Sequence, residues 1–208
     1  MNSLYVLLPA AAYLIGSIPF GLLLSRSSGI DIRQHGSGNI GATNVSRLVG
    51  KKIGLLTLLL DAAKGWLPVI AAGLLLNDDP SRSLITALCG AAAVTGHSFS
   101  VFLRFKGGKG VATALGIFLA LSPQALLISL LVFILTVAAT GFVSLGSLLA
   151  AAAMLPSLYF FAEASWKFWL AAYVVLMIWF KHHQNIRRLL NGTEKRFRDK
   201  EPITQKTA

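Results

Sequence analysis

The chain has 208 residues, of which 55% are hydrophobic and 13% are charged, and its mean hydropathy is +0.68. This composition excludes a soluble globular domain and is typical of a protein that crosses a membrane several times. The net charge of +11 does not indicate nucleic acid as a partner. The basic residues lie between apolar runs, where anionic lipid headgroups and anionic substrates explain them better.

Apolar runs near or above the roughly 20 residues needed to cross a bilayer recur along the chain. They predict an all-α, polytopic integral membrane protein with seven transmembrane helices and glycine-rich cytoplasmic loops. We expect one domain, residues 1–194, followed by a basic tail, residues 195–208. The first residues carry no Lys or Arg, so no cleavable signal peptide is expected. The predicted spans are residues 4–25, 53–76, 84–103, 111–121, 124–140, 144–161 and 168–181.

The basic residues gather in alternate links between these spans. All Lys and Arg residues except Lys64, Arg82 and Lys167 fall in links that would share one side of the membrane. The tendency of positive links to stay inside predicts that this side is cytoplasmic and that the N-terminus is outside. All the polar, glycine-rich stretches then meet on one side, which suggests a shared site.

The first polar stretch, GSGNIGATNVSR, covers residues 36–47. Its glycines allow the backbone to approach a ligand closely. Ser37, Asn39 and Asn44 supply neutral hydrogen-bonding groups, and Arg47 supplies a planar fork that suits phosphate. A flexible linker that ends in a helix cap is the alternative, since Thr43 or Asn44 could cap a helix. The crowding of Gly, Asn and Arg favours a ligand site.

The second stretch, GHSFSVFLRFKGGKG, covers residues 96–110 and connects two apolar runs. Glycines before a helix start present free backbone N–H groups, and the helix end and a lysine add positive charge. Gly107, Gly108, Gly110 and Lys109 are therefore predicted to form an anion cradle. The alternative is a basic cytoplasmic loop without a ligand.

The third stretch, HHQNIRRLLNGTE, covers residues 182–194, where the last span leaves the bilayer. On a continuous helix, His182 and Asn185 share a face because they are three residues apart. Arg187 and Arg188 are expected to reach lipid phosphates. A solvated interfacial histidine is the alternative for His182.

Asp61 and Lys64 lie three residues apart inside a predicted span, and we expect them to pair on one helix face. Ionisable residues at such depth are candidates for function, although a pair could serve packing alone. Cys89 is expected in the core. The sequence contains no Cys/His cluster with metal-ligand spacing and no GxSxG, HExxH or HxxxxD arrangement, so neither a metal nor a cofactor is expected.

The three polar stretches, in this order and spacing, resemble the three motifs of the bacterial acyl-phosphate:glycerol-3-phosphate acyltransferases, the PlsY family. The similarity runs from the first span to about residue 194. It implies an enzyme of the bacterial inner membrane with its site facing the cytoplasm. Its partners would be acyl phosphate, glycerol 3-phosphate and membrane lipids, and its products lysophosphatidic acid and phosphate, from acyl transfer to the 1-hydroxyl of glycerol 3-phosphate.

The resemblance also implies roles for individual residues. Residues of the first motif would bind phosphate and substrate, and the glycines and lysine of the second would hold phosphate groups. His182 and Asn185 would contact glycerol 3-phosphate, and either Ser144 or Ser147 would join them, with Ser147 favoured. The proton acceptor is left open between His182 and the substrate's own phosphate. The implied set is His182, Asn185 and Lys109 as catalytic residues, and Ser37, Asn39, Asn44, Arg47, Gly107, Gly108, Gly110 and Ser147 as substrate-binding residues.

The alternative from another class is a small anion or phosphate-ester transporter. Transporters of that kind tend to carry matching interrupted helices in two halves, with a site at the membrane midplane. The sequence shows no such repeat, and its polar stretches gather on one predicted side. These two observations favour an enzyme.

Overall fold

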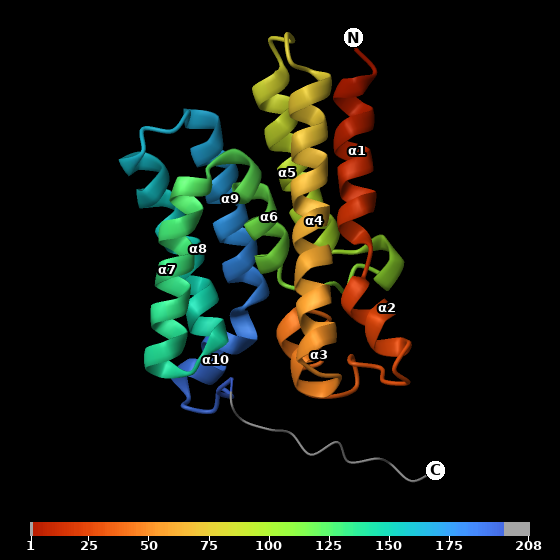
Figure 1. Cartoon of the computed structure of the whole chain (residues 1–208), viewed down its shortest axis with the longest axis vertical. Helices are drawn as coiled ribbons and strands as arrows, with labels where there is room; N and C mark the ends of the chain where they lie inside the picture. The colour runs from red at the N-terminus through yellow and green to blue at the C-terminus, as the bar shows by residue number, and fades with distance from the viewer. Residues whose placement is uncertain (1, 198–208) are drawn as a thin grey trace.

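The computed structural model describes residues 2–197, and within them every regular element is helical. This confirms the all-α prediction (Figure 1). The elements in chain order are α1 (Leu4–Ser17), α2 (Phe20–Arg26), α3 (Ala42–Leu48), α4 (Lys51–Leu75), α5 (Arg82–Ser98), the 3₁₀ turn η1 (Val101–Leu103), α6 (Val111–Leu121), α7 (Pro123–Thr140), α8 (Val143–Phe160), α9 (Ser165–Lys181) and α10 (His183–Leu190).

Within residues 2–197, five helical segments are long and apolar enough to cross a bilayer, which agrees with a multi-pass membrane protein. They are Leu4–Arg26, Lys51–Leu75, Arg82–Leu103, Pro123–Thr140 and Val143–Phe160. The predicted fourth span, α6, has 11 residues, and the predicted seventh, α9, has 17. At 1.5 Å per residue, α6 reaches only about 17 Å of a hydrocarbon core that is roughly 30 Å thick. The count of seven spans therefore stays a prediction.

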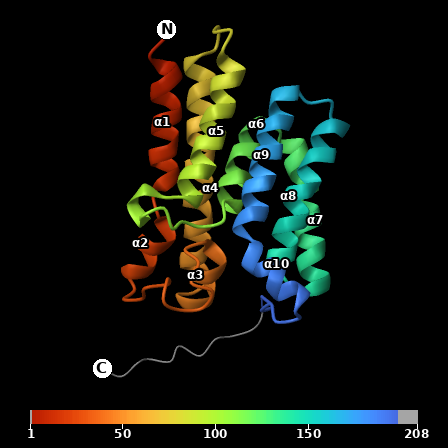
Figure 2. The same cartoon turned by 180° about the vertical axis from the view of Figure 1, so that it is seen from behind.

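The helices form two groups that meet at α6. Helices α1, α4 and α5 pack together on one side, and α7, α8 and α9 pack together on the other (Figure 1). Figure 2 shows α9 beside α5 on the opposite face, where the two groups contact each other. Helix α6 lies against α4 so closely that a Cβ atom on Gly65 would meet the Thr113 carbonyl, and one on Gly116 would meet the Ala62 carbonyl. Small residues permit such close helix pairs in membranes.

The predicted first span is interrupted. Helix α1 ends at Ser17, Ile18 is extended with ψ 119°, and α2 begins at Phe20. Pro19 causes this break because it disfavours helical geometry at the preceding residue. The break leaves carbonyl groups without helical partners. Lys64 donates from Nζ to the Ile18 carbonyl at 2.9 Å, and Ser100 donates from Oγ to the Ser17 carbonyl.

The chain after α5 turns back at the side of the bundle. Helix α5 ends at Ser98, five residues before the predicted end of the third span. In Figure 1, the segment after α5 lies beside the α1–α2 break, about midway along the bundle and farther from its lower end than α3 and α10. Arg104 and Phe105 adopt left-handed φ values of 51° and 62° in this turn. Non-helical backbone at such depth is tolerated where it is packed against protein or lines a cavity.

Candidate functional site

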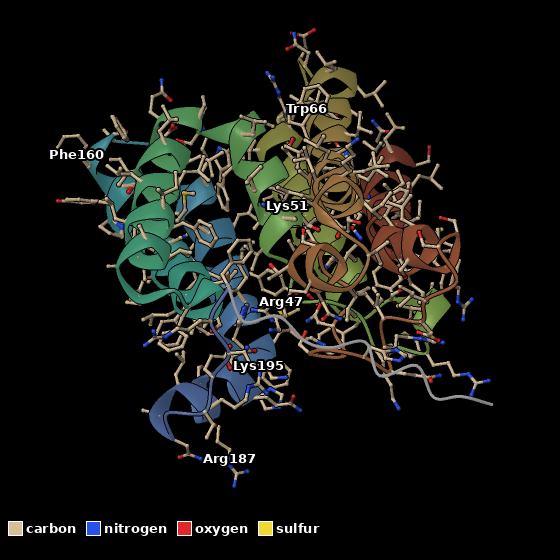
Figure 3. All side chains as sticks on the ribbon, turned by 60° about the horizontal axis from the view of Figure 1, so that its bottom comes forward. Arg47, Lys51, Trp66, Phe160, Arg187 and Lys195 are labelled. Atoms are coloured by element: carbon tan, nitrogen blue, oxygen red, sulfur yellow. The ribbon has the colours of Figure 1, made fainter. Side chains whose placement is uncertain are left out.

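A cavity of about 320 Å³ lies where the three polar stretches and the start of α8 converge. Arg47 and Lys195 both line it, and they lie near each other in Figure 3, which brings this end of the molecule forward, whereas Trp66 and Phe160 lie away from them. The polar and charged residues that line the cavity are Ser37, Asn39, Thr43, Asn44, Arg47, Asp61, His97, Lys109, Ser144, Ser147, Asn185, Arg188, Glu194 and Lys195.

Asn44 holds the first polar stretch in shape. Its side chain is 2% exposed, and its amide nitrogen donates to the carbonyl groups of Ile32, His35 and Asn39 at 3.1, 3.3 and 2.9 Å. Its amide oxygen accepts from the backbone N–H of Ser37 at 3.1 Å. With both ends of its amide occupied by the loop, Asn44 positions the neighbouring lining residues.

Arg47 extends from the last turn of α3 to the mouth of the cavity. One of its terminal nitrogens, Nη2, donates to the carbonyl of Arg196 at 3.1 Å. Its Nε is buried and has no hydrogen-bond partner within the described residues. A buried N–H without a partner carries a desolvation cost, so this group is suited to an anionic ligand.

Gly107 and Gly108 do not line the cavity, contrary to the cradle predicted from the sequence. Their N–H groups already donate to the carbonyl groups of Ser98 and His97, at 3.3 and 2.9 Å. A Cβ atom on Gly107 would meet the His97 carbonyl, and one on Gly108 would meet the His97 ring. The paired glycines therefore allow the loop to pack against the end of α5, and their N–H groups are not free to bind an anion.

The start of α6 provides the free N–H groups instead. Gly110 precedes the helix with a φ of 81°, and it lines the cavity together with Val111 and Ala112. The N–H groups in the first turn of a helix have no carbonyl partner within the helix, and the helix dipole places positive charge there. This end of α6 is a site of the kind that binds phosphate groups.

Lys109 lies beside that helix start and points to the third polar stretch. Its Nζ donates to Oδ1 of Asn185 at 2.6 Å. Burial lowers the pKa of Lys109 to about 8, against the opposing effect of the Glu194 carboxylate. The ammonium is therefore charged near neutral pH but loses its charge over the mildly alkaline range.

Glu194 joins the third stretch to α8, and the sequence prediction did not single it out. Asn185 donates to its Oε1 and Arg188 to its Oε2, both at 2.6 Å, and Ser144 donates to Oε1 at 2.7 Å. Burial raises the pKa of Glu194, but these hydrogen bonds outweigh burial and hold the pKa below its ordinary value. Glu194 thus remains a carboxylate that orients Asn185.

Only one of the two candidate serines belongs to this polar network. Both Ser144 and Ser147 line the cavity, but Ser144 contacts Glu194, whereas Ser147 donates to the Val143 carbonyl of its own helix at 2.9 Å. The sequence favoured Ser147. The structure connects Ser144 to the polar network and places Ser147 where the cavity meets an apolar groove.

His182 lies behind the cavity and does not line it. The ring is 2% exposed, and Nδ1 lies 2.8 Å from the Ile178 carbonyl, so this nitrogen carries the proton. Burial, with the Lys109 charge as a further cause, lowers the pKa of His182 to about 4. The ring is therefore neutral at physiological pH.

Asp61 and His97 line the cavity and are almost fully buried. Oδ1 of Asp61 lies 2.9 Å from Nζ of Lys64 and 3.8 Å from Nδ1 of His97, and all three side chains are nearly inaccessible. The predicted Asp61–Lys64 pair is therefore present. The sequence prediction included the stretch that contains His97 but did not single out this residue.

An apolar groove of about 480 Å³ continues from the polar cavity, between α4 and α6 on one side and α7 and α8 on the other. Most of its lining is aliphatic or aromatic, including Leu130, Ile134 and Met154. The residues that line both the cavity and the groove are Ala42, Thr43, Leu58, Val111, Ala112, Phe133 and Ser147. The combined site is suited to a molecule with an anionic end and a long apolar chain.

Within residues 2–197, the structure contains no group of three or more His, Cys, Asp or Glu residues that could hold a metal ion.

The fold is that of a multi-pass membrane protein, and its site joins a cation-rich cavity to an apolar groove. Residues 6–192 match the sequence profile of the family described as glycerol-3-phosphate acyltransferase. The chain belongs to this family.

Curated relatives and solved structures agree with this assignment. The glycerol-3-phosphate acyltransferase of Desulfotalea psychrophila is 53% identical over 92% of this chain and 98% of its own length. That of Trichlorobacter lovleyi is 54% identical over 91% and 95%. The crystal structure of PlsY (YgiH), an integral membrane glycerol 3-phosphate acyltransferase in its glycerol 3-phosphate form, matches with a TM-score of 0.87 and 40% identity over 92% of this chain and 94% of that one.

Proposed function

We propose that the protein transfers a fatty acyl group from acyl phosphate to the 1-hydroxyl of glycerol 3-phosphate and releases lysophosphatidic acid and inorganic phosphate. The observation that carries this proposal is the joining of a cation-rich cavity to an apolar groove through shared lining residues. Family membership supports the acceptor. The solved relative PlsY has a glycerol 3-phosphate form and a lysophosphatidic acid form.

The lining suits a reaction that needs positioning more than an enzymic nucleophile. Acyl phosphate is a mixed anhydride whose phosphate is already a good leaving group. Arg47, Lys109 and the start of α6 would hold two phosphate groups near each other, and the groove would hold the acyl chain. Fixing the reacting atoms in this way can account for much of a rate enhancement.

In the proposed step, the 1-hydroxyl oxygen attacks the acyl carbonyl carbon. An ester bond forms, the bond from the carbonyl carbon to the phosphate oxygen breaks, and the hydroxyl proton passes to phosphate. His182 is a poor candidate for the base, because its ring is buried and does not line the cavity. This supports a substrate phosphate as the proton acceptor.

The test compares donors. Purified protein with glycerol 3-phosphate is supplied with either acyl phosphate or acyl-CoA, and lysophosphatidic acid and phosphate are measured. We expect turnover with acyl phosphate and none with acyl-CoA. Lys109→Ala should lower kcat/KM with acyl phosphate at least about tenfold, because charge-assisted hydrogen bonds contribute roughly 1.5–3 kcal/mol. Equal turnover with acyl-CoA would overturn the proposed donor. Uptake of glycerol 3-phosphate into liposomes without turnover would favour the transporter.

We also propose the bacterial inner membrane as the location, with the N-terminus outside and the cavity facing the cytoplasm. The first described residues and α10 lie at opposite ends of the bundle (Figure 1), which suits this arrangement. Cysteine labelling from outside intact cells should reach positions 79 and 165 but not positions 37 and 193. External labelling at position 37 would reverse the orientation.

A further inference from the structure

The chain does not leave the bundle after α10. Residues 194–197, the C-terminal strap, cross from α10 to the turn between α7 and α8 and are fixed along their length. The Glu194 carboxylate is held at one end by Ser144, Asn185 and Arg188. At the other end, the Phe197 N–H donates to the Gly141 carbonyl at 2.8 Å.

The middle of the strap is attached to α3 and α8. The Arg196 carbonyl accepts the hydrogen bond from Arg47, and the Arg196 guanidinium lies 5.7 Å from the centre of the Phe142 ring. That distance is within the range of a cation–π contact. Residues 195–197 lie in the segment that the sequence assigned to a basic tail, and the whole strap follows the part of the chain that matches the family profile, residues 6–192. Residues 198–208 of the predicted tail lie outside the described residues.

The strap passes over both parts of the site. Lys195 lines the polar cavity, and Phe197 lines the apolar groove. Phe197 lines the groove and is still 47% exposed, so it lies at the open edge of the groove. A residue at this edge can cover what the groove holds.

The proposed donor gives this cover a chemical role. Water that reaches the acyl carbonyl would split the same bond that transfer splits and yield a fatty acid and phosphate. Closing a site against water prevents such side reactions. We infer that the C-terminal strap is part of the acyl-donor site and that Phe197 shields the bound acyl phosphate from water. This inference rests on the proposed function.

The experiment measures phosphate released per lysophosphatidic acid formed, using purified full-length protein with acyl phosphate and glycerol 3-phosphate. The wild type should give a ratio near one. Phe197→Ala should raise the ratio at least about twofold, because water then reaches the carbonyl. Phe197→Leu should stay near the wild-type ratio. Phe160→Ala is the matched control, since Phe160 is an exposed aromatic residue that lines neither the cavity nor the groove.

Two shortened chains separate the strap from the residues that follow it. A chain that ends at Phe197 should keep the wild-type ratio of phosphate to lysophosphatidic acid. A chain that ends at Glu194 should raise this ratio as Phe197→Ala does. If wild-type protein forms no lysophosphatidic acid from acyl phosphate, the proposed function fails. If the wild type is active and Phe197→Ala lowers both products together without a change in the ratio, the strap has only a structural role and the inference is overturned.

Discussion

Nζ of Lys64 on α4 lies 2.9 Å from the carbonyl oxygen of Ile18, where the first span is broken before Pro19. The same ammonium pairs with Asp61 at 2.9 Å, and Asp61 lines the polar cavity. A buried backbone carbonyl that has lost its helical partner needs another donor. Lys64 therefore connects the break in the first span to a residue that lines the site.

Removing Lys64 should destabilise the protein strongly. Lys64→Met leaves Asp61 buried without its charged partner and the Ile18 carbonyl without a donor, so we expect a loss of about 3–5 kcal/mol. Asp61→Leu combined with Lys64→Met should recover part of this loss, because the uncompensated charge is gone. Unfolding in detergent measures the effect. Lys52→Met is the control at an exposed position of the same helix, and equal stability of the two single variants would contradict the prediction.

The rate should fall in alkaline solution as Lys109 loses its proton. Burial lowers the pKa of this group to about 8, so the ammonium is present below that pH and is lost above it. We expect kcat/KM for glycerol 3-phosphate to decline as the pH rises through about 8, since this quantity reports ionisations of the free enzyme. In Lys109→Arg the decline should disappear, because a guanidinium stays charged.

Lys106→Ala is the control for that profile, since Lys106 is exposed and does not line the cavity. It should keep the wild-type midpoint. An unchanged midpoint in Lys109→Arg would show that another group is responsible for the alkaline decline.

Gly107→Ala and Gly108→Ala should lower stability before they affect substrate affinity. The added methyl groups would meet the carbonyl and the ring of His97, and overpacking of this kind costs roughly 1–3 kcal/mol. Gly73→Ala is the control inside α4, where the nearest atom to an added Cβ is 3.8 Å away. Thermal unfolding in detergent and KM for glycerol 3-phosphate are measured together. Unchanged stability with a raised KM would restore the predicted phosphate cradle at these glycines.

Replacing Asn185 should lower activity much more than replacing its exposed neighbour His183. Asn185 accepts from Lys109 and donates to Glu194, both at 2.6 Å, so Asn185→Ala removes the connection between them. We expect kcat/KM to fall at least about tenfold, since hydrogen bonds to charged groups contribute roughly 1.5–3 kcal/mol. His183→Ala should change it less than about threefold. Activity assays at matched membrane expression compare the two, and equal losses would contradict the bridging role of Asn185.

The features that could be predicted from the sequence are those that depend on local composition. Apolar runs identified the membrane helices, and clusters of Gly, Asn and basic residues identified segments that line one cavity. Asn44, Arg47, Lys109 and Asn185 are all found there. The residue types indicated a ligand site because few kinds of side chain can bind a phosphate group.

The remaining features depend on contacts between distant segments. Glu194 is held by Ser144, which is 50 residues away in sequence, and His97 packs on glycines of a loop that turns back beneath it. No local pattern indicates which carboxylate or ring such a turn will meet. The two glycines were correctly identified as a place of close approach, but Gly107 approaches the carbonyl of His97 and Gly108 approaches its ring, and neither approaches a ligand in this structure.

The position of Glu194 sets the order in which the site can be assembled during synthesis. Arg47, Lys109 and Ser144 are inserted with earlier helices, but Asn185 takes up its bridging position only when Glu194 and the residues after it have left the ribosome. A nascent chain that holds all of its apolar helices therefore still lacks a complete site. A chain that stops before Glu194 lacks the carboxylate that holds Asn185 and Ser144 together.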